Sequence, residues 1–207
     1  GPPRFREAFC PHRSGTRPPC SASVGPSAFR RAATRISLLL AAEALRSVPT
    51  VATTVTTPLG PAPGRVLRTD IVVVPVLRAG LSMLEPVLQL VPSARVGHIG
   101  LQRDESTAVA SRYYSKLPVG LAQSHVLMVD PMLATGGSAA AAVDLVKASG
   151  ARSIALVCII SAPEGVGMLQ MRHPDVDIYT PIVDKELNAH KFIVPGLGDF
   201  GDRLYGT

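Results

Sequence analysis

Tryptophan is absent from the 207 residues, and aromatic residues make up only 4% of them, although 46% are hydrophobic. Aliphatic side chains must therefore fill the core. No hydrophobic run approaches the roughly 18 residues that a membrane-spanning helix needs, so we expect no membrane association. The length suits one well-buried α/β domain and is too short for two ordinary ones.

Cysteine is also scarce, and its pattern indicates whether the protein works in an oxidising or a reducing cellular compartment. Cys10, Cys20 and Cys158 show no metal-ligand spacing, and an odd number of cysteines makes a poor disulfide framework. We therefore predict a reducing compartment and a cytoplasmic protein. The arginine-rich, acid-poor start also resembles an organelle transit peptide, but it lacks an amphipathic helix, so targeting to an organelle is the less favoured alternative.

Positive charge is distributed unevenly. The formal net charge is +6; residues 1–50 carry eight arginines against two glutamates, while the rest of the chain carries thirteen charges of each sign. A balanced main domain gives little reason to expect nucleic-acid binding. Residues 1–26 are rich in proline and lack apolar periodicity, so we predict a divergent, largely unstructured arm there, followed by a single domain over residues 27–207.

The rest of the chain alternates between two hydrophobic periodicities. Helical spacing predicts helices over residues 27–46, with Ser27 as the N-cap, and over 81–90, 137–149 and 164–173. Apolar and β-branched runs, with a turn-rich connection at 58–64, predict strands over 50–57, 71–76, 95–101, 125–130, 153–160 and 176–180. This order predicts an α/β fold with a mostly parallel, twisted sheet flanked by helices. Ligands of such sheets bind beyond the carboxyl ends of the strands.

The segment that follows the strand ending at Asp130 has the composition of a phosphate-binding loop. Gly136 and Gly137 let backbone N–H groups point inward, the hydroxyls of Thr135 and Ser138 add donors, and the helix that opens there favours an anion at its N-terminus. The spacing is neither that of a Walker loop nor that of a dinucleotide-binding turn. Asp130 is placed to accept hydrogen bonds from a ribose whose 5-phosphate the loop holds.

From Asp130 to Ser138 the sequence resembles the motif with which type I phosphoribosyltransferases bind phosphoribosyl pyrophosphate (PRPP). Most members carry a second acid where this chain has Pro131, and proline is typical of the uracil-specific branch. The resemblance implies the type I phosphoribosyltransferase fold, with a small hood formed by terminal segments. It also implies the reaction of uracil with PRPP to give UMP and diphosphate, a step of pyrimidine salvage. PRPP would be bound by Asp130, Pro131, Met132, Leu133, Ala134, Thr135, Gly136, Gly137 and Ser138.

Two further motifs resemble the same family. The Leu-Arg-Ala-Gly segment that ends at Gly80 implies that Arg78 contacts pyrophosphate, for which a planar guanidinium group is well suited. The Arg-Asp-Glu segment that begins at Arg103 implies that this arginine also binds PRPP. We interpret Asp104 and Glu105 as part of a lid and not as a general acid and base.

The C-terminal block, residues 192–207, closely resembles the uracil-binding terminus of the family. A glycine-rich, irregular loop exposes backbone groups, which can read the alternating donors and acceptors of a pyrimidine dione. The resemblance implies that Ile193, Gly198, Asp199 and Phe200 contact uracil, and that Asp199 also faces PRPP through a metal ion. Many relatives have alanine at position 200, so a backbone contact there is expected and a role for the side chain is left open.

The resemblance also implies a catalytic set, a cofactor and partners. Arg78, Arg103, Asp130 and Asp199 would align the reactants and stabilise the charge of a ribosyl cation and its leaving pyrophosphate. Mg²⁺ would be carried mainly by PRPP, with no direct protein ligand expected. The base that deprotonates uracil is not assigned. We expect a homodimer or a higher homo-oligomer, and GTP, to which some relatives respond, is a candidate allosteric activator. The family's N-terminal arm is not recognisable in residues 1–26.

Three alternatives stay open. An enzyme for a purine, xanthine or orotate would usually carry two adjacent acids before the phosphate loop, which Pro131 opposes. A PRPP- or uracil-sensing regulator that binds RNA would need a basic face, and the charge balance after residue 50 offers none in sum. A catalytically weakened paralogue is opposed by the intact Arg78, Arg103, Asp130 and Asp199.

Overall fold

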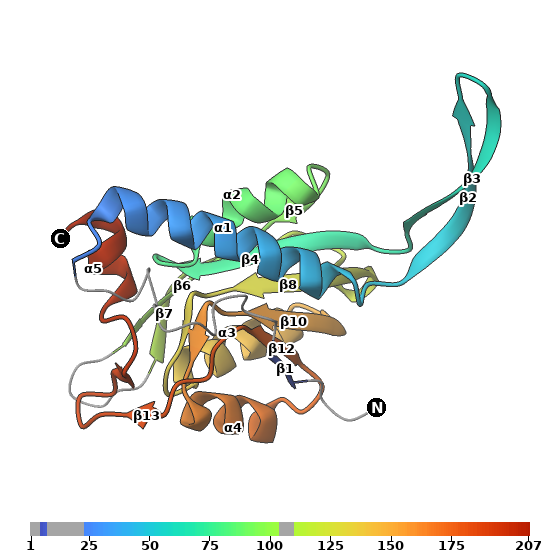
Figure 1. Ribbon diagram of the computed structural model, residues 1–207. Helices are drawn as coiled ribbons and strands as arrows, with labels where there is room; N and C mark the ends of the chain where they lie inside the picture. The colour runs from blue at the N-terminus through green and yellow to red at the C-terminus, as the bar shows by residue number, and fades with distance from the viewer. Residues whose placement is uncertain (1–4, 8–22, 104–109) are drawn as a thin grey trace.

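A single large sheet organises the computed structural model, which describes residues 5–7, 23–103 and 110–207. Its strands follow the order β1-β12-β10-β8-β4-β6-β7, with β5 beside β4 (Figure 1). All pairs are parallel except β6 with β7. The strands are β1 (Phe5–Glu7), β4 (Asp70–Leu77), β5 (Arg95–Val96), β6 (His98–Arg103), β7 (Ala110–Lys116), β8 (Ser124–Val129), β10 (Ser153–Val157) and β12 (Asp177–Thr180). The predicted α/β class with a mostly parallel sheet is confirmed.

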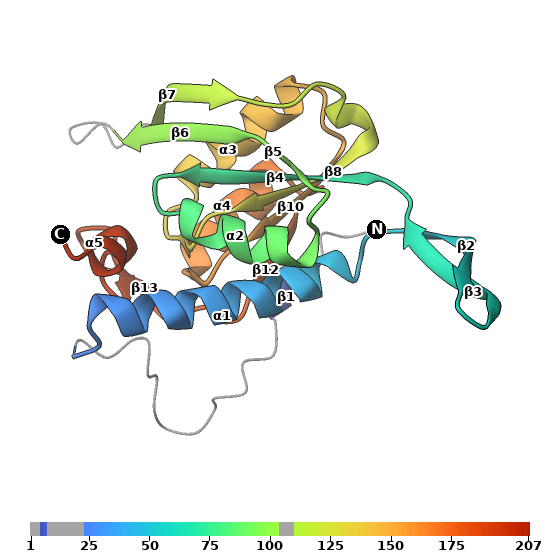
Figure 2. The same ribbon diagram turned by 90° about the horizontal axis from the view of Figure 1, so that it is seen from above.

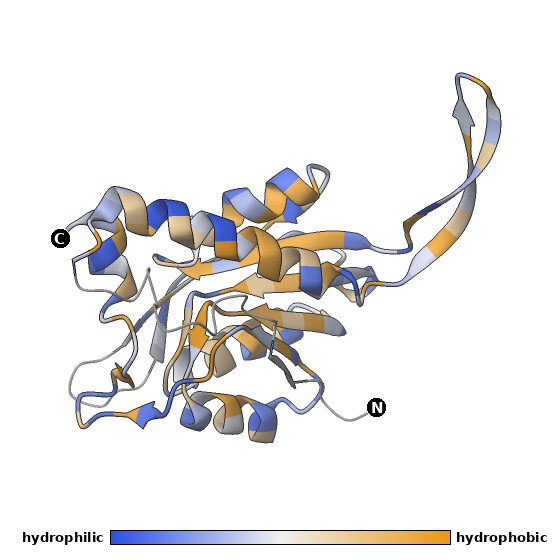
Figure 3. Cartoon of the chain, viewed as in Figure 1, coloured by the Kyte–Doolittle hydropathy of each residue, from blue (hydrophilic) through white to orange (hydrophobic). Residues whose placement is uncertain are grey.

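Helices cover both faces of this sheet. On one face lie α1 (Pro26–Leu45) and α2 (Leu81–Leu90), and on the other lie α3 (Gly137–Ala148) and α4 (Pro163–Arg172) (Figure 2). Alternate residues of β4 serve the two layers, because successive side chains of a strand point to opposite faces. Val73 packs in the cluster with α1 and α2, whereas Val72 and Val74 pack in the cluster with α3 and α4. The central strands are accordingly hydrophobic along their length (Figure 3).

A long β-hairpin projects from this body (Figure 1). It consists of β2 (Thr50–Thr57) and β3 (Gly60–Leu67), paired antiparallel from Thr50↔Leu67 to Thr57↔Gly60. We expected residues 58–64 to be a connection, and this was wrong, because most of them belong to β3. Pro61 and Pro63 misled the prediction; proline is tolerated in an edge strand, where its missing N–H is not needed by a neighbour.

The N-terminal part departs from the sequence-based prediction at two points. Phe5–Glu7 form β1, which pairs with β12, although we predicted an unstructured arm over residues 1–26. The division of the chain at residue 26 stays a prediction. Helix α1 begins at Pro26 after Gly25, without a side-chain cap, so the predicted N-cap at Ser27 was wrong. Proline suits the first turn of a helix because its nitrogen has no hydrogen to leave unpaired.

Short elements complete the fold. The predicted strand over 153–160 is divided into β10 and β11 (Ile160–Ser161), and β11 pairs with β9 (Met132–Leu133). The hairpin of β13 (Glu186–Leu187) and β14 (Ile193–Val194) precedes the last helix, α5 (Phe200–Tyr205), and the 3₁₀ helix η2 is Leu121–Gln123. Within the described ranges, no helix is long and apolar enough to cross a membrane.

Candidate active site

The sequence motifs gather at one end of the molecule. The ends of β4 and β6 and the helix α5 lie there in both views, and the β2–β3 hairpin lies at the opposite end (Figures 1 and 2). This is the edge where parallel strands present their carboxyl ends, which is where ligands of α/β sheets bind. The topology therefore brings Arg78, Asp130 and the C-terminal block to the same side of the sheet.

The phosphate loop, residues 130–138, joins β8 to α3. Gly136 has φ +82° and precedes the first residue of α3, so the chain turns sharply into the helix. A Cβ atom at Gly136 would lie 2.8 Å from the carbonyl oxygen of Gly165, so the position has no room for a side chain. The N–H of Gly137 donates to Oγ1 of Thr135 at 3.5 Å, and the N–H of Ala140 donates to the carbonyl of Gly136 at 2.8 Å. The N-terminus of a helix favours an anion, and phosphate binding by this loop stays a prediction.

Backbone hydrogen bonds hold the phosphate loop against the next strand of the sheet. The N–H of Asp130 donates to the carbonyl of Val157 at 3.1 Å. The carbonyl of Pro131 accepts from Ile159 and from Ile160, at 3.0 and 3.1 Å. The carbonyl of Leu133 accepts from Ala162 at 2.9 Å. These bonds attach the first part of the loop, residues 130–133, to the segment that begins at the end of β10, and a fixed backbone favours precise binding of a ligand.

Asp130 lies at the tip of β8 in a desolvated position. Burial raises the pKa of its carboxyl group to about 7, and the hydrogen bond from the N–H of Met132 opposes this increase only weakly. The carboxyl group is therefore poised between its two protonation states near neutral pH. Such a group can accept or donate hydrogen bonds to ligand hydroxyls, and perturbed carboxyl groups of this kind are typical of functional sites.

Arg78 follows β4, the neighbour of β8, and lines an open cleft of about 510 Å³. Leu77, Leu101, Gln102 and Tyr113 form the rest of the lining. The Leu77–Arg78 peptide bond is cis. Close packing fixes the turn behind it: a Cβ atom at position 80, which is glycine, would lie 2.5 Å from the carbonyl oxygen of Val129. The turn that carries Arg78 is thus packed against the last residue of β8, directly before the phosphate loop. The contact of Arg78 with pyrophosphate stays a prediction.

Two predicted features lie next to or within residues 104–109, which the structure does not describe. Arg103 is the last residue of β6, where its backbone pairs with Ala110 of β7. The predicted lid residues Asp104 and Glu105 lie outside the described residues.

Tyr113, on the returning strand, was not predicted to line a site. Its ring lies across Gly100, where a Cβ atom would be 2.5 Å from the ring; a glycine facing an aromatic residue across two strands is the signal that could have indicated it.

The C-terminal loop, residues 193–200, carries the predicted base-binding residues. Ile193 and Phe200 are buried and belong to the hydrophobic core cluster that includes α1 and α2. The Val194–Pro195 bond is cis, and Gly198 has φ +78°. Asp199 is the N-cap of α5, where its Oδ1 accepts from the N–H of Asp202 at 2.9 Å.

Sequence reasoning missed the residues that hold this loop in place. The Oδ2 atom of the buried Asp184 accepts from the N–H of Gly196 at 2.8 Å. Arg203 donates to the carbonyl of Leu197 at 2.9 Å. A buried acid is unusual unless it has a hydrogen-bond partner, but the sequence does not reveal that Asp184 is buried. Both contacts become visible only in the tertiary structure.

Three features together define the type I phosphoribosyltransferase class. One strand of a parallel sheet ends in an acid, a glycine-rich phosphate loop follows it, and the neighbouring strand is followed by a turn that carries an arginine. Structural comparison agrees. A hypoxanthine-guanine phosphoribosyltransferase from Bacillus anthracis superimposes with a TM-score of 0.53 at 13% identity, covering 77% of this chain and 80% of that one, and thus shares the fold. The AQ2163 protein from Aquifex aeolicus superimposes with a TM-score of 0.86 at 36% identity, covering 93% and 97% of the two chains.

Sequence comparison identifies the branch. The family model of uracil phosphoribosyltransferase matches residues 20–207. A uracil phosphoribosyltransferase from Dictyoglomus thermophilum is 53% identical over 186 residues, covering 89% of this chain and 90% of that one. One from Clostridium perfringens is 50% identical, with 89% of each chain covered. The chain belongs to the uracil phosphoribosyltransferase family, and it is by class a glycosyltransferase of pentosyl groups.

Proposed function

We propose that the protein transfers the 5-phosphoribosyl group of PRPP to uracil, giving UMP and diphosphate in pyrimidine salvage. A bond forms between a ring nitrogen of uracil and the anomeric carbon, the bond from that carbon to the pyrophosphate oxygen breaks, and the ring nitrogen loses its proton. The main support for this proposal is that one chain combines the phosphate loop, which includes Pro131, with the glycine-rich C-terminal loop. The chain is also about 50% identical to relatives named uracil phosphoribosyltransferase.

The phosphate loop binds the ribose 5-phosphate in this proposal. The N–H groups at the start of α3 and the hydroxyl groups of Thr135 and Ser138 surround the phosphate, with the residues from Pro131 to Gly137 shaping the loop. Asp130 accepts hydrogen bonds from the ribose hydroxyls. Because the loop is hydrogen-bonded to its neighbouring strand, it holds the anomeric carbon in one place, and alignment of this kind lowers the barrier without a protein nucleophile.

Arg78 stabilises the leaving pyrophosphate. The open cleft beside it has room for a polyanion, and guanidinium groups bind phosphate oxygens in pairs. The family resemblance assigns Arg103, the last residue of β6, to the same anion. Charge that develops on the leaving group is then met by groups that are already in position, which is the most effective form of electrostatic catalysis.

The C-terminal loop binds uracil through its backbone. In this proposal Ile193, Gly198, Asp199 and Phe200 contact the base through backbone groups, while the side chains of Ile193 and Phe200 pack in the core. The left-handed conformation of Gly198 exposes its peptide groups at a position that a larger residue could adopt only with strain. Alternating donors and acceptors of this kind discriminate a pyrimidine dione from other bases.

Mg²⁺ accompanies PRPP. Among the residues that the structure describes, no group of three His, Cys, Asp or Glu side chains could hold a metal ion. The available donors, the carboxylates of Asp130 and Asp199, fit a hydrated ion that is bound mainly by substrate oxygens. When bound, Mg²⁺ neutralises pyrophosphate charge; the protein's own residues bind, align and exclude water.

A homodimer or larger homo-oligomer forms through the β2–β3 hairpin. An isolated two-stranded hairpin is marginal in water, and this one exposes Val51, Val55, Leu59 and Val66. A second copy of the chain would cover these side chains. We place the protein in the cytoplasm, and GTP is to be tested as an activator.

The experiment is an assay of the purified protein with Mg²⁺, PRPP and, in parallel, uracil, hypoxanthine, xanthine and orotate. UMP and diphosphate formed with uracil alone, in a one-to-one ratio, are expected. Turnover with another base would retain the PRPP site and reject the assignment of the C-terminal loop. Binding of PRPP without turnover of any base would instead identify a sensor. Addition of GTP and measurement of mass in solution test the activator and the oligomer.

A further inference from the structure

The first turns of α1 hold the C-terminal helix α5. The ring centroids of Phe29 and Phe200 lie 5.0 Å apart in an edge-to-face arrangement, and Cζ of Arg203 lies 4.5 Å from the centroid of the Phe29 ring. Arg30 donates a hydrogen bond of 2.7 Å to the carbonyl of Leu204. Helices from the two ends of the described domain are thus joined by aromatic, cationic and hydrogen-bonded contacts.

Helix α5 cannot hold its position alone. It has six residues, whereas isolated helices shorter than about 12 residues are marginal in water. Its stability must come from tertiary packing, and Phe200 and Leu204 are the residues of α5 that are buried. Phe29 therefore fixes where α5 begins.

The same contacts reach the C-terminal loop. Arg203 is fixed over the ring of Phe29 and donates to the carbonyl of Leu197 at 2.9 Å. Its Cδ atom lies 3.9 Å from where a Cβ atom of Gly198 would be, so its stem backs that residue. Asp199 caps the helix that Phe200 anchors. Leu197 and Gly198 are thus contacted by Arg203, which stacks on Phe29, and Asp199 precedes Phe200, which packs against Phe29.

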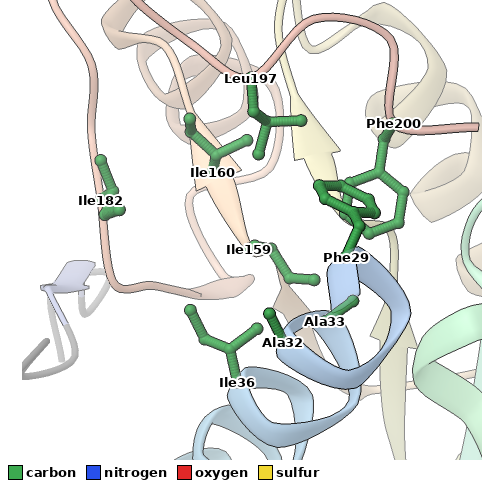
Figure 4. A pocket seen from close by; sticks show the side chains of 9 residues that line it. All are labelled: Phe29, Ala32, Ala33, Ile36, Ile159, Ile160, Ile182, Leu197 and Phe200. Atoms are coloured by element: carbon green, nitrogen blue, oxygen red, sulfur yellow. The ribbon is translucent and has the colours of Figure 1, made fainter. Parts of the chain in front are cut away.

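A small apolar cavity lies beside the two rings. Its volume is about 30 Å³, and Figure 4 shows Phe29 and Phe200 at one side of it, with Leu197, Ile159 and Ile160 around it. Packing at this junction is therefore incomplete. Removal of either ring would enlarge an existing void, and the loop would have space to shift toward α1.

We propose that Phe29 is a positioning residue for the base, acting through Phe200 and Arg203 on the backbone of residues 197–199. The proposal rests on the proposed function, because it assigns the contact with uracil to that backbone. It also gives Phe200 two roles: its ring faces the core and anchors the loop, while its peptide group faces the ligand. Of the residues proposed to bind PRPP, Asp199 alone lies among residues 197–199, so the effect on uracil binding should exceed the effect on PRPP binding.

The test compares Phe29→Ala and the conservative Phe29→Leu with Leu121→Ala. Leu121 is fully buried in η2, before β8, and thus lies at the opposite edge of the sheet from the site. In Phe29→Ala we expect KM for uracil to rise about tenfold or more, because displacement of a binding group by an ångström has effects of this size or larger. KM for PRPP should rise less than KM for uracil, because only Asp199 of its proposed binding residues lies among residues 197–199. Phe29→Leu should recover most of the loss. Phe29→Ala with Phe200→Ala should cost less than the sum of the two single changes, since both remove the contact between the two rings.

Hydrogen exchange gives a readout that does not require turnover. In Phe29→Ala the amides of residues 199–206 should exchange faster than in the wild type, while in Leu121→Ala they should not, even where both variants lose similar thermal stability. If Leu121→Ala raises KM for uracil and exchange at 199–206 as much as Phe29→Ala does, the role of Phe29 is merely structural and the proposal fails. If the wild type does not use uracil, the proposed function fails separately, and the exchange comparison still decides whether Phe29 holds the loop.

Discussion

The phosphate loop and the C-terminal loop lie at the same edge of the sheet, but they are held by different kinds of contact. Residues 130–138 are bonded to the strand beside them, through carbonyls that accept from Ile159, Ile160 and Ala162. Residues 193–200 depend on distant side chains, namely Asp184 and, through Phe200 and Arg203, Phe29. The first loop is held mainly by backbone groups, so side-chain truncations nearby should displace it less than they displace the second loop, which depends on side chains far away in the sequence.

The largest expected effect concerns the chemistry of the phosphate loop. Asp130→Asn keeps the shape of the side chain but removes its charge and half of its acceptor capacity toward the ribose. We expect kcat/KM to fall by about 10²–10³-fold, the range found when one positioned polar group of an active site is removed. Steady-state kinetics check this, with circular dichroism to verify folding. A loss below about threefold would mean that Asp130 does not contact the substrate.

The second prediction tests how rigidly the phosphate loop is packed. In Gly165→Ala the new Cβ atom would lie 2.4 Å from the carbonyl oxygen of Ala134 and 2.8 Å from that of Leu133, and neither backbone atom can move freely. We expect a loss of about 3 kcal/mol in the free energy of unfolding, at the upper end of the overpacking range, together with a higher KM for PRPP. Urea denaturation measures the first quantity.

Gly167→Ala is the matched control, on the same helix. A Cβ atom there would have nothing within 4 Å, and alanine favours a helix over glycine by up to about 1 kcal/mol. The control should be neutral or stabilising. Equal effects of the two substitutions would contradict the claim that α4 packs tightly against the phosphate loop.

The sequence predicted the phosphate loop better than the C-terminal loop for the same physical reason. Helix α2 was predicted with its observed ends, Leu81 and Leu90, and the acid at the tip of β8 was placed correctly, because local periodicity and turn chemistry determine these features. The contact of Phe29 with Phe200 joins the two ends of the domain, and no local pattern encodes it. Helical spacing marked Phe29 as a core residue but could not name its partner.

The third prediction concerns the support of the C-terminal loop by Asp184. In Asp184→Ala the buried N–H of Gly196 loses its partner, and an unsatisfied buried donor costs about 2 kcal/mol. In Asp184→Asn the side-chain oxygen can still accept, so less than half of that loss is expected. Thermal unfolding of both variants and KM for uracil are the measurements. If asparagine proves as damaging as alanine, the hydrogen bond to Gly196 is not what Asp184 contributes.

The smallest effect is the pH dependence of stability that Asp130 introduces. Its pKa is raised to about 7 in the folded protein, against about 3.9 in an unfolded chain. Between these values the folded state holds a proton that the unfolded state releases, so stability falls as the pH rises from about 4 to about 7. The shift sets an upper limit of about 4 kcal/mol on this loss. Asp130→Asn lacks this titration. The free energy of unfolding of the variant should therefore equal that of the wild type at pH 4 and should exceed it increasingly up to pH 8. Urea unfolding across this range decides the point: a difference between the two proteins that does not change with pH would show that the carboxyl group titrates normally, and that the phosphate loop holds it without a cost in stability.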